Sequence, residues 1–333
     1  MEKDYLRVNV AAVSTNQHAL DFTENKRRIF RSIEMCKSIG VAYRAGGELE
    51  VSGYSCDDHF KELDTIYHCW EVVNDLLQTD LTENIIVEMN MPVIHKSVCY
   101  NSKVLVLNRR IIFIRPKAEN ADEGNYRESR YFVPYIPHEK GVLEEFMLPL
   151  IIESQTGQRT CPFGLGLIQC LDTSFGLSFS RISLKAGQGR LAYLNNADFV
   201  VGSTAVHFTA GYKKRNIETI QAETFKNGGA YIFANLLGCD GNNTYFAGGN
   251  NIIQNGNVLG TGKYHTLNDI EICQGVLNLQ KIRLQRQRFT GGQRMMLEQD
   301  ILPTVQLEHN MCTPGIKYSK PYEPTYDSAQ QVF

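Results

Sequence analysis

Strand-like and helix-like segments alternate along the first part of this chain, and that order constrains its fold more than any other feature of the sequence. Residues 6–13 have the alternating pattern of a strand, and residues 23–39 carry apolar side chains at helical spacing. The same pair of patterns returns as a strand at 41–51 and an amphipathic helix at 57–77. The predicted core stripe of that second helix is Phe60, Leu63, Tyr67, Trp70 and Leu77. Alternating β and α units predict mixed sheets covered by helices, and therefore an α/β fold.

Further strands follow in closer succession. Strand-like runs are expected at 84–91, 97–107, 110–115, 165–171, 198–201, 229–235, 246–262 and 269–279, with a helix at 213–226. The late hairpin-like runs add an antiparallel component to the sheets. We expect one domain over residues 1–302. After it we expect an extended, linker-like tail at 303–333 that wraps a surface or a neighbouring subunit.

Composition excludes several classes of protein. Lysine and arginine (34) nearly balance aspartate and glutamate (36), so the net charge of -2 gives no global attraction to nucleic acid or to an anionic membrane. No apolar run approaches the roughly 18 residues of a membrane span, and the N-terminus lacks the layout of a signal peptide. The nine cysteines are scattered without a CxxC pair, so we expect mostly reduced, buried thiols in a cytoplasmic protein, with no metal and no cofactor.

Three widely spaced polar residues mark the candidate functional site. Glu48 lies in the glycine-bounded block 46–54, and Lys117 lies just beyond the strand-like run 110–115. Ser180 follows much later, after the strand-like run at 165–171. A carboxylate, a lysine and a nucleophile are what amide hydrolysis through a covalent intermediate requires: a general base, a stabiliser of the oxyanion and an attacking group.

With a cysteine in place of Ser180, this series would be the Glu-Lys-Cys apparatus of the nitrilase-type carbon–nitrogen hydrolases. The sequence resembles one branch of that superfamily, the glutaminase domain of eukaryotic glutamine-dependent NAD synthetase. The resemblance covers residues 5–290 and rests on blocks at 19–22, 46–54, 115–128 and 226–241. It implies a four-layer α-β-β-α sandwich.

The resemblance also implies a role for each candidate residue. Glu48 would be the general base and Lys117 the cation that stabilises the tetrahedral oxyanion. Tyr54 and Tyr126 would line the glutamine pocket, and Ser180 would stand at the position of the nucleophile. The alternative to these catalytic roles is that Glu48 and Lys117 persist as a buried ion pair that maintains the fold.

The sequence departs from the family where the substrate is attacked and held. A thiol has an unperturbed pKa of about 8.5, whereas a hydroxyl is far harder to ionise and needs a close base such as histidine. The nearest histidine in sequence is His207, and Cys170 is better interpreted as an apolar filler than as a displaced nucleophile. Arg181 stands where the family has the glutamate that holds the substrate's ammonium group, and Gly211 takes the place of the arginine that helps to hold its carboxylate.

Several functions fit this pattern. The leading hypothesis is a catalytically inactive pseudoenzyme with a degenerate triad (Glu48, Lys117, Ser180) and a remnant substrate pocket (Tyr54, Tyr126, Arg181). Its partner would be itself, as a homodimer or a larger assembly such as a filament, or another protein. Another hypothesis is an amidase that uses Ser180 on a non-glutamine amide, or a glutaminase component related to NAD synthesis. A regulatory ligand binder is the third. The Ser-Gly-Gly-x-Asp-Ser loop of the synthetase domain has no match here, so we do not expect this chain alone to make NAD.

Overall fold

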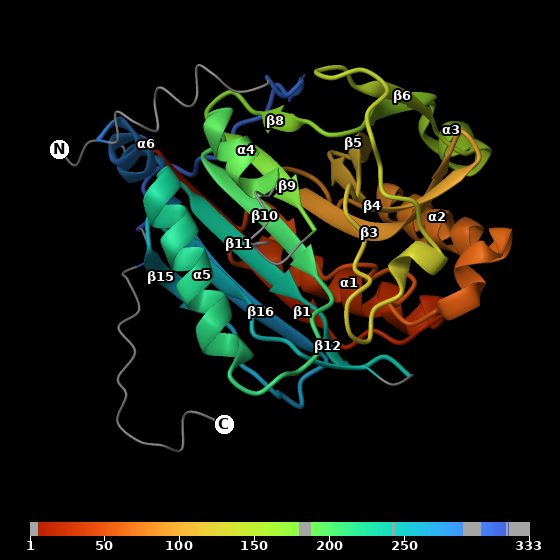
Figure 1. Cartoon of the computed structure of the whole chain (residues 1–333). Helices are drawn as coiled ribbons and strands as arrows, with labels where there is room; N and C mark the ends of the chain where they lie inside the picture. The colour runs from red at the N-terminus through yellow and green to blue at the C-terminus, as the bar shows by residue number, and fades with distance from the viewer. Residues whose placement is uncertain (1–5, 180–187, 242–243, 289–300, 318, 320–333) are drawn as a thin grey trace.

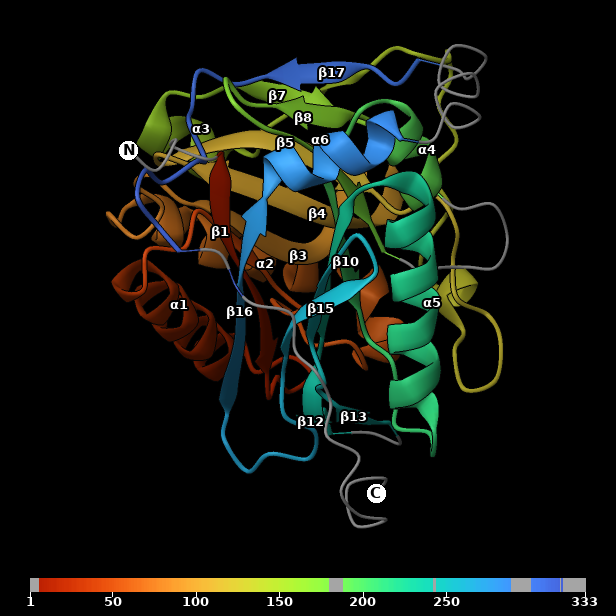
Figure 2. The same ribbon diagram turned by 90° about the vertical axis from the view of Figure 1, so that its left-hand side faces the viewer.

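The computed structural model describes residues 6–179, 188–241, 244–288, 301–317 and 319. Two large mixed β-sheets pack face to face (Figures 1 and 2). The strand order of the eight-stranded sheet is β16 (Ile270–Asn278), β1 (Arg7–Thr15), β2 (Tyr43–Ala45), β3 (Ile86–His95), β4 (Val98–Leu107), β5 (Arg110–Pro116), β7 (Thr160–Phe163) and β6 (Glu144–Met147). The order of the seven-stranded sheet is β15 (Asn257–Thr261), β14 (Asn251–Gln254), β11 (Ala230–Asn235), β10 (Phe199–Thr204), β9 (Ser174–Ser178), β8 (Leu167–Gln169) and β17 (Thr304–Gln306). A short separate pair is β12 (Leu237–Cys239) with β13 (Tyr245–Ala247).

Helices cover both outer faces of this pair of sheets. Figure 2 shows α1 (Phe22–Ser38) and α5 (Tyr212–Asn227) on opposite sides of the molecule. The other helices are α2 (Leu63–Leu77), α3 (Leu150–Thr156), α4 (Gln188–Leu194) and α6 (Leu279–Gln287), with short 3-10 turns η1 (Asp57–Lys61) and η2 (Glu128–Arg130). The α-β-β-α layers expected from the sequence are therefore present. Within the described parts of the chain, no helix is both long and apolar enough to cross a membrane.

Strand β1 shows how side-chain alternation builds these layers. Val8, Val10 and Ala12 join the core between the two sheets, together with aromatic rings from β9 and β10. Ala11 and Val13 point the other way and join the core under α1 and α2. Successive residues of a strand face opposite sides of its sheet, so a strand buried on both faces needs apolar side chains at nearly every position.

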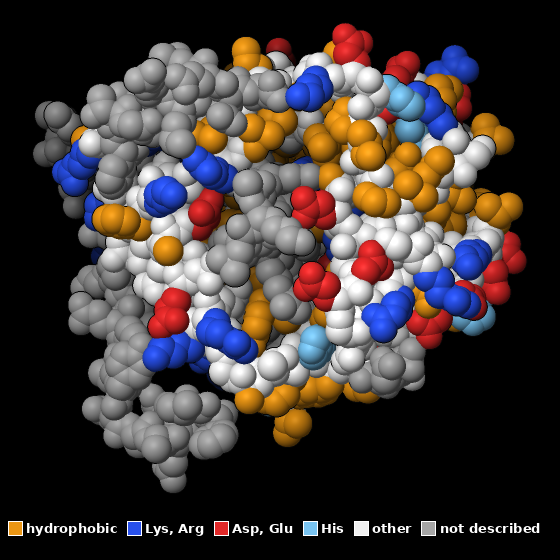
Figure 3. Space-filling model, viewed as in Figure 1, with side chains coloured by type: hydrophobic (Ala, Val, Ile, Leu, Met, Phe, Trp, Pro, Cys, Tyr) orange, Lys and Arg blue, Asp and Glu red, His pale blue; other side chains and the backbone are white. Residues whose placement is uncertain are grey.

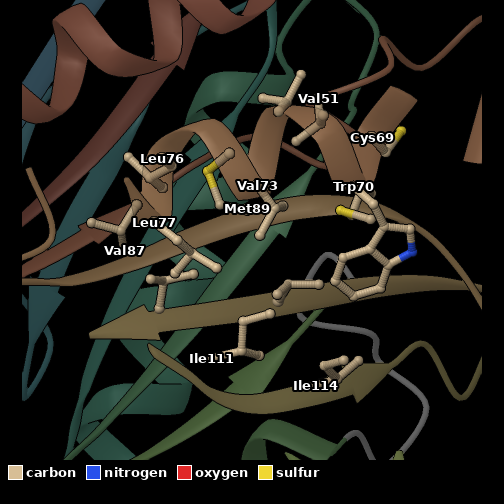
Figure 4. Close-up of a cluster of buried hydrophobic side chains, with 14 of the residues drawn as sticks. Val51, Cys69, Trp70, Val73, Leu76, Leu77, Val87, Met89, Ile111 and Ile114 are labelled. Atoms are coloured by element: carbon tan, nitrogen blue, oxygen red, sulfur yellow. The ribbon is translucent and has the colours of Figure 1, made fainter. Parts of the chain in front are cut away.

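The second predicted helix is divided into two. Residues 57–61 form η1, Glu62 is extended (φ -90°, ψ 130°), and α2 begins at Leu63. The break changes which side chains face the core. Leu63 is 72% exposed and Tyr67 50% exposed, so their predicted place in the core stripe is wrong. Figure 4 shows the stripe that α2 does bury, which includes Cys69, Trp70, Val73, Leu76 and Leu77.

The strand expected at 41–51 is also much shorter than predicted. Only Tyr43–Ala45 form β2, and Glu48 lies in the turn that follows. A Cβ atom at Gly47 would lie 2.5 Å from Leu236 Cδ2, so the backbone approaches its neighbour as closely as only glycine allows. The Glu48 backbone N–H donates to the Thr204 carbonyl on β10 at 3.2 Å. The turn therefore ties Glu48 to the seven-stranded sheet.

The region before Ser180 differs from the prediction as well. The run 165–171 contains only β8, and a hairpin leads from it to β9, which sequence patterning did not predict. Phe179 is the last described residue after β9. Residues 180–187, which include Ser180 and Arg181, lie outside the described residues.

Part of the C-terminal tail adds to the sheet. Strand β17 pairs in parallel with β8, and Met311, farther along, is buried in the core between the sheets. The Asp172 carboxylate accepts hydrogen bonds from the backbone N–H groups of Met311 (3.0 Å) and Cys312 (2.8 Å). Residues 304–312 therefore pack on the domain.

Candidate functional site

The site is built around the ammonium group of Lys117, which follows directly after β5. Its Nζ lies 2.5 Å from Glu48 Oε1 and 2.7 Å from Glu128 Oε2. All three side chains are buried. One ammonium thus lies between two carboxylates, and it donates charge-assisted hydrogen bonds to both.

Backbone and amide contacts hold the two carboxylates in place. Asn101 on β4 donates its side-chain N–H to Glu48 Oε1 at 2.7 Å. The Lys117 backbone N–H donates to the Asn101 carbonyl at 2.8 Å, so the lysine and the amide that supports its partner are fixed to each other. Glu128 begins η2, and its Oε2 accepts the Ala121 N–H at 2.9 Å. These contacts come from a strand, a turn and a loop that meet at the edge of the eight-stranded sheet.

Burial and neighbouring charge move the pKa values of this group in opposite directions. Burial is the largest influence on Glu48, and with the nearby Glu128 carboxylate it raises the pKa from its ordinary 4.5 to about 7, against the lowering effect of Lys117. Burial alone would lower the pKa of Lys117, but the charges of Glu48 and Glu128 outweigh it, so the pKa is raised. The lysine is therefore a fixed cation, whereas Glu48 can exchange a proton near neutral pH.

Two tyrosines extend the site outward. Tyr54 donates its hydroxyl to Glu128 Oε1 at 2.6 Å, and its ring meets that of Tyr126 edge to face at 6.0 Å. Tyr126 donates to the Ala205 carbonyl at 2.9 Å, and its hydroxyl lies 2.7 Å from His207 Nδ1. A cavity of about 370 Å³ lies beside these two tyrosines. Its lining includes Tyr54, Phe60, Tyr126, Glu128, Arg130 and Phe132.

The structure brings some of the predicted site residues together, and others lie outside the described residues. Glu48, Lys117 and Tyr54 belong to one hydrogen-bonded network through Glu128, and Tyr126 lies beside it. Ser180 and Arg181 belong to the residues that are not described, so their places stay predictions. His207 contacts Tyr126, and Cys170 is buried with its pKa raised by burial to about 12, which does not suit a nucleophile.

Sequence reasoning missed Glu128 and Asn101. Glu128 is the last residue of the block 115–128 that carries the resemblance, two residues after Tyr126, and an acidic residue in that position is the signal that could have found it. Asn101 sits mid-strand and no pattern marks it. Cys239 is exposed, whereas the sequence led us to expect mostly buried thiols. Among the described residues, no group of histidine, cysteine or acidic side chains is arranged to hold a metal ion.

Comparison with known proteins decides the family. Residues 9–287 match the carbon–nitrogen hydrolase family. The chain belongs to the carbon–nitrogen hydrolases. Its fold, two mixed sheets between helices, is that of the nitrilase superfamily, as the sequence led us to expect.

Within this family the chain is similar to glutamine-dependent NAD(+) synthetases. It is 40% identical to that of Drosophila melanogaster over 281 residues, which are 84% of this chain and 36% of the relative. It is 34% identical to the human protein over 329 residues, which are 98% of this chain and 46% of the relative. This carbon–nitrogen hydrolase domain therefore spans less than half the length of these relatives.

Solved structures agree on the fold. A glutamine-dependent NAD(+) synthetase from Cytophaga hutchinsonii superposes with a TM-score of 0.69 at 21% identity, covering 81% of this chain and 43% of that one. A mutant amidase from Nesterenkonia sp. AN1 superposes with a TM-score of 0.61 at 14% identity, covering 87% of this chain and 96% of that one. That amidase shows covalent addition of the acetamide moiety of fluoroacetamide at its active-site cysteine.

Proposed function

We propose that this carbon–nitrogen hydrolase domain is a glutaminase-like pseudoenzyme: it keeps the acid and the amine of the family's site but does not hydrolyse amides. The observation that carries the proposal is the closed network in which Lys117 binds Glu48 and Glu128 at once. Removing one partner from a buried ion network costs about 3–5 kcal/mol, so these residues are retained for stability even without catalysis. Ser180, at the position of the nucleophile by resemblance, offers an alcohol where the amidase of known structure uses a cysteine.

One observation favours a second candidate, an amidase that uses Ser180. The pKa of Glu48, raised to about 7, is that of a general base able to take a proton at neutral pH. Such an enzyme would act on an amide other than glutamine, because Arg181 stands at the position that holds an ammonium group in the family. A role as the glutaminase component of NAD synthesis would require a synthetase activity to use the released ammonia.

Ammonia release from a panel of amides, glutamine included, separates the two candidates. The pseudoenzyme proposal predicts that the native chain releases no more ammonia than Ser180→Ala or Glu48→Gln. It also predicts that Ser180→Cys does not create glutaminase activity, because the residues at the two substrate-anchoring positions differ as well. Saturable release by the native chain that both Ser180→Ala and Glu48→Gln abolish would instead establish the amidase.

We propose further that the domain acts as a homo-oligomer. Apolar side chains gather at the upper right of the surface in Figure 3, where Figure 1 places β6 and α3. In this part of the chain, Met147 is 63% exposed and Leu150 79% exposed, and Val133, Ile136 and Val142 are exposed too. Apolar residues exposed together are typical of an interaction surface. Native mass measurement of the purified protein tests for the assembly, and a purely monomeric species would reject it.

A further inference from the structure

A second cluster of acid, amine and hydroxyl lies between the sheets, apart from the Lys117 network. Lys103 Nζ lies 3.0 Å from Glu88 Oε1 and 2.6 Å from Ser203 Oγ, and Ser203 Oγ lies 2.7 Å from Glu88 Oε2. All three side chains are fully buried. No function discussed above uses them.

The cluster joins the two sheets. Glu88 on β3 and Lys103 on β4 belong to the eight-stranded sheet, whereas Ser203 belongs to β10 of the other sheet. Tyr43 donates its hydroxyl to Glu88 Oε1 at 2.7 Å. With this contact, each of the two oxygens of the Glu88 carboxylate has at least two hydrogen-bond donors. Burying a charged pair carries a desolvation penalty that well-packed apolar side chains would avoid. An apolar side chain could therefore fill this position at a lower desolvation cost than an ammonium.

Phe179 connects this cluster to the candidate site. Its ring centroid lies 5.2 Å from Lys103 Nζ and 5.8 Å from Lys117 Nζ, both within the range of a cation–π contact. The ring is buried and follows directly after β9. In sequence it immediately precedes Ser180. The ammonium groups of two separate ion networks thus contact one ring at the start of the segment that carries the candidate nucleophile.

We propose that Lys103 is a positioning residue: held by Glu88 and Ser203, it fixes the Phe179 ring and with it the end of β9 that leads to Ser180. Lys117 contacts the same ring, so the position of the chain at Phe179 is defined relative to the Glu48–Lys117–Glu128 network. The ammonium of Lys103 acts through the ring and not on a substrate. This role does not depend on whether the domain hydrolyses amides, because it concerns only where the chain is held.

Hydrogen exchange measured by mass spectrometry tests the proposal, with Lys103→Met as the main variant and Lys26→Met as its control. Lys26 makes an exposed pair with Asp75, far from β9 in the chain. We expect Lys103→Met to raise exchange at residues 177–179 by about fivefold or more relative to peptides from the β1–β16 pair, as the loss of a desolvated cation–π contact implies. A lysine that merely stabilised the fold would raise exchange in both regions equally, and that result would overturn the proposal.

Two further variants decide the matter if Lys103→Met does not fold. Ser203→Ala keeps the Lys103–Glu88 pair but removes the hydroxyl that contacts the ammonium. Phe179→Leu keeps an apolar side chain but removes the ring. Each is expected to raise exchange selectively at residues 177–179. If both leave that segment as protected as in the native chain, Lys103 does not position it.

Discussion

At the scale of single residues, Lys117 is the side chain on which the candidate site depends. Its ammonium compensates two buried carboxylates, Glu48 and Glu128. The lysine was predicted correctly as a residue just beyond a strand, because a strand that ends at Pro116 delivers the next side chain to the edge of the sheet. The second carboxylate that binds Lys117 was not predicted, because Glu128 lies in a loop-rich stretch whose path no local sequence pattern determines.

Replacing Lys117 with methionine should destabilise the domain strongly. Lys117→Met leaves two carboxylates buried without a cation, and we expect the free energy of unfolding to fall by about 3–5 kcal/mol. Lys26→Met, which removes a lysine from an exposed pair with Asp75, should change it by less than about 1 kcal/mol. Urea denaturation of both variants measures the difference. Equal effects would show that the Lys117 network contributes nothing special to stability.

Glu48 should make stability depend on pH in a defined window. Its pKa is raised from 4.5 to about 7 in the folded state. Between these values the folded state keeps a proton that the unfolded state has lost, so the contribution is fully present below pH 4.5 and is lost as pH rises through 7. Glu48→Gln removes the titrating group.

The measurement compares native chain and Glu48→Gln by urea denaturation at pH 5 and pH 8. We expect the native chain to lose more of its free energy of unfolding between these pH values than the variant does. If the difference between the two proteins is the same at both pH values, Glu48 does not titrate in this window.

At the scale of elements, close backbone approaches explain where local patterns failed. The strand predicted at 41–51 ends early because Gly46 and Gly47 allow neighbouring side chains to pack against the backbone, and periodicity cannot register such contacts. The helix predicted at 57–77 breaks at Glu62, although the segment contains no proline or glycine that would indicate a break. By contrast, α1 and α5 match their predicted ranges closely. The apolar stripe of α1 is the kind of pattern that periodicity detects best.

Strand β10 contains a glycine that its packing requires. A Cβ atom at Gly202 would lie 2.0 Å from the hydroxyl oxygen of Tyr231 on the neighbouring β11. We expect Gly202→Ala to lower the free energy of unfolding by about 1–3 kcal/mol, as overpacking does. Gly189→Ala is the matched control, since its Cβ would approach Tyr231 Cε2 only to 4.0 Å. Thermal unfolding compares them, and a harmless Gly202→Ala would mean that Tyr231 has room to move.

At the scale of the whole molecule, two sheets placed between helices leave the site at an edge where strands, turns and loops from both sheets meet. The layers could be predicted from the order of elements together with the family resemblance. The exposed apolar surface could not, because the residues that form it lie in the loop-rich stretch between β5 and β7, where exposure depends on the course of the chain.

If this surface mediates self-association, charged substitutions on it should dissociate the assembly. Met147→Glu combined with Leu150→Glu places like charges on the proposed interface, and we expect the native mass to fall to that of a monomer with an unchanged melting temperature. Leu267→Glu, at a fully exposed leucine outside this stretch, should leave the mass unchanged. An assembly that survives the double substitution would place the interface elsewhere.

The most direct test of the central claim is mass spectrometry of the native chain, intact and after digestion into peptides. The chain is first incubated with an excess of simple amides and quenched rapidly with acid. A pseudoenzyme that retains Glu48 and Lys117 only for stability should show no acyl adduct on any peptide. An added acyl group on the peptide that contains Ser180, absent from Ser180→Ala, would contradict the account and establish this domain as a serine-dependent amidase.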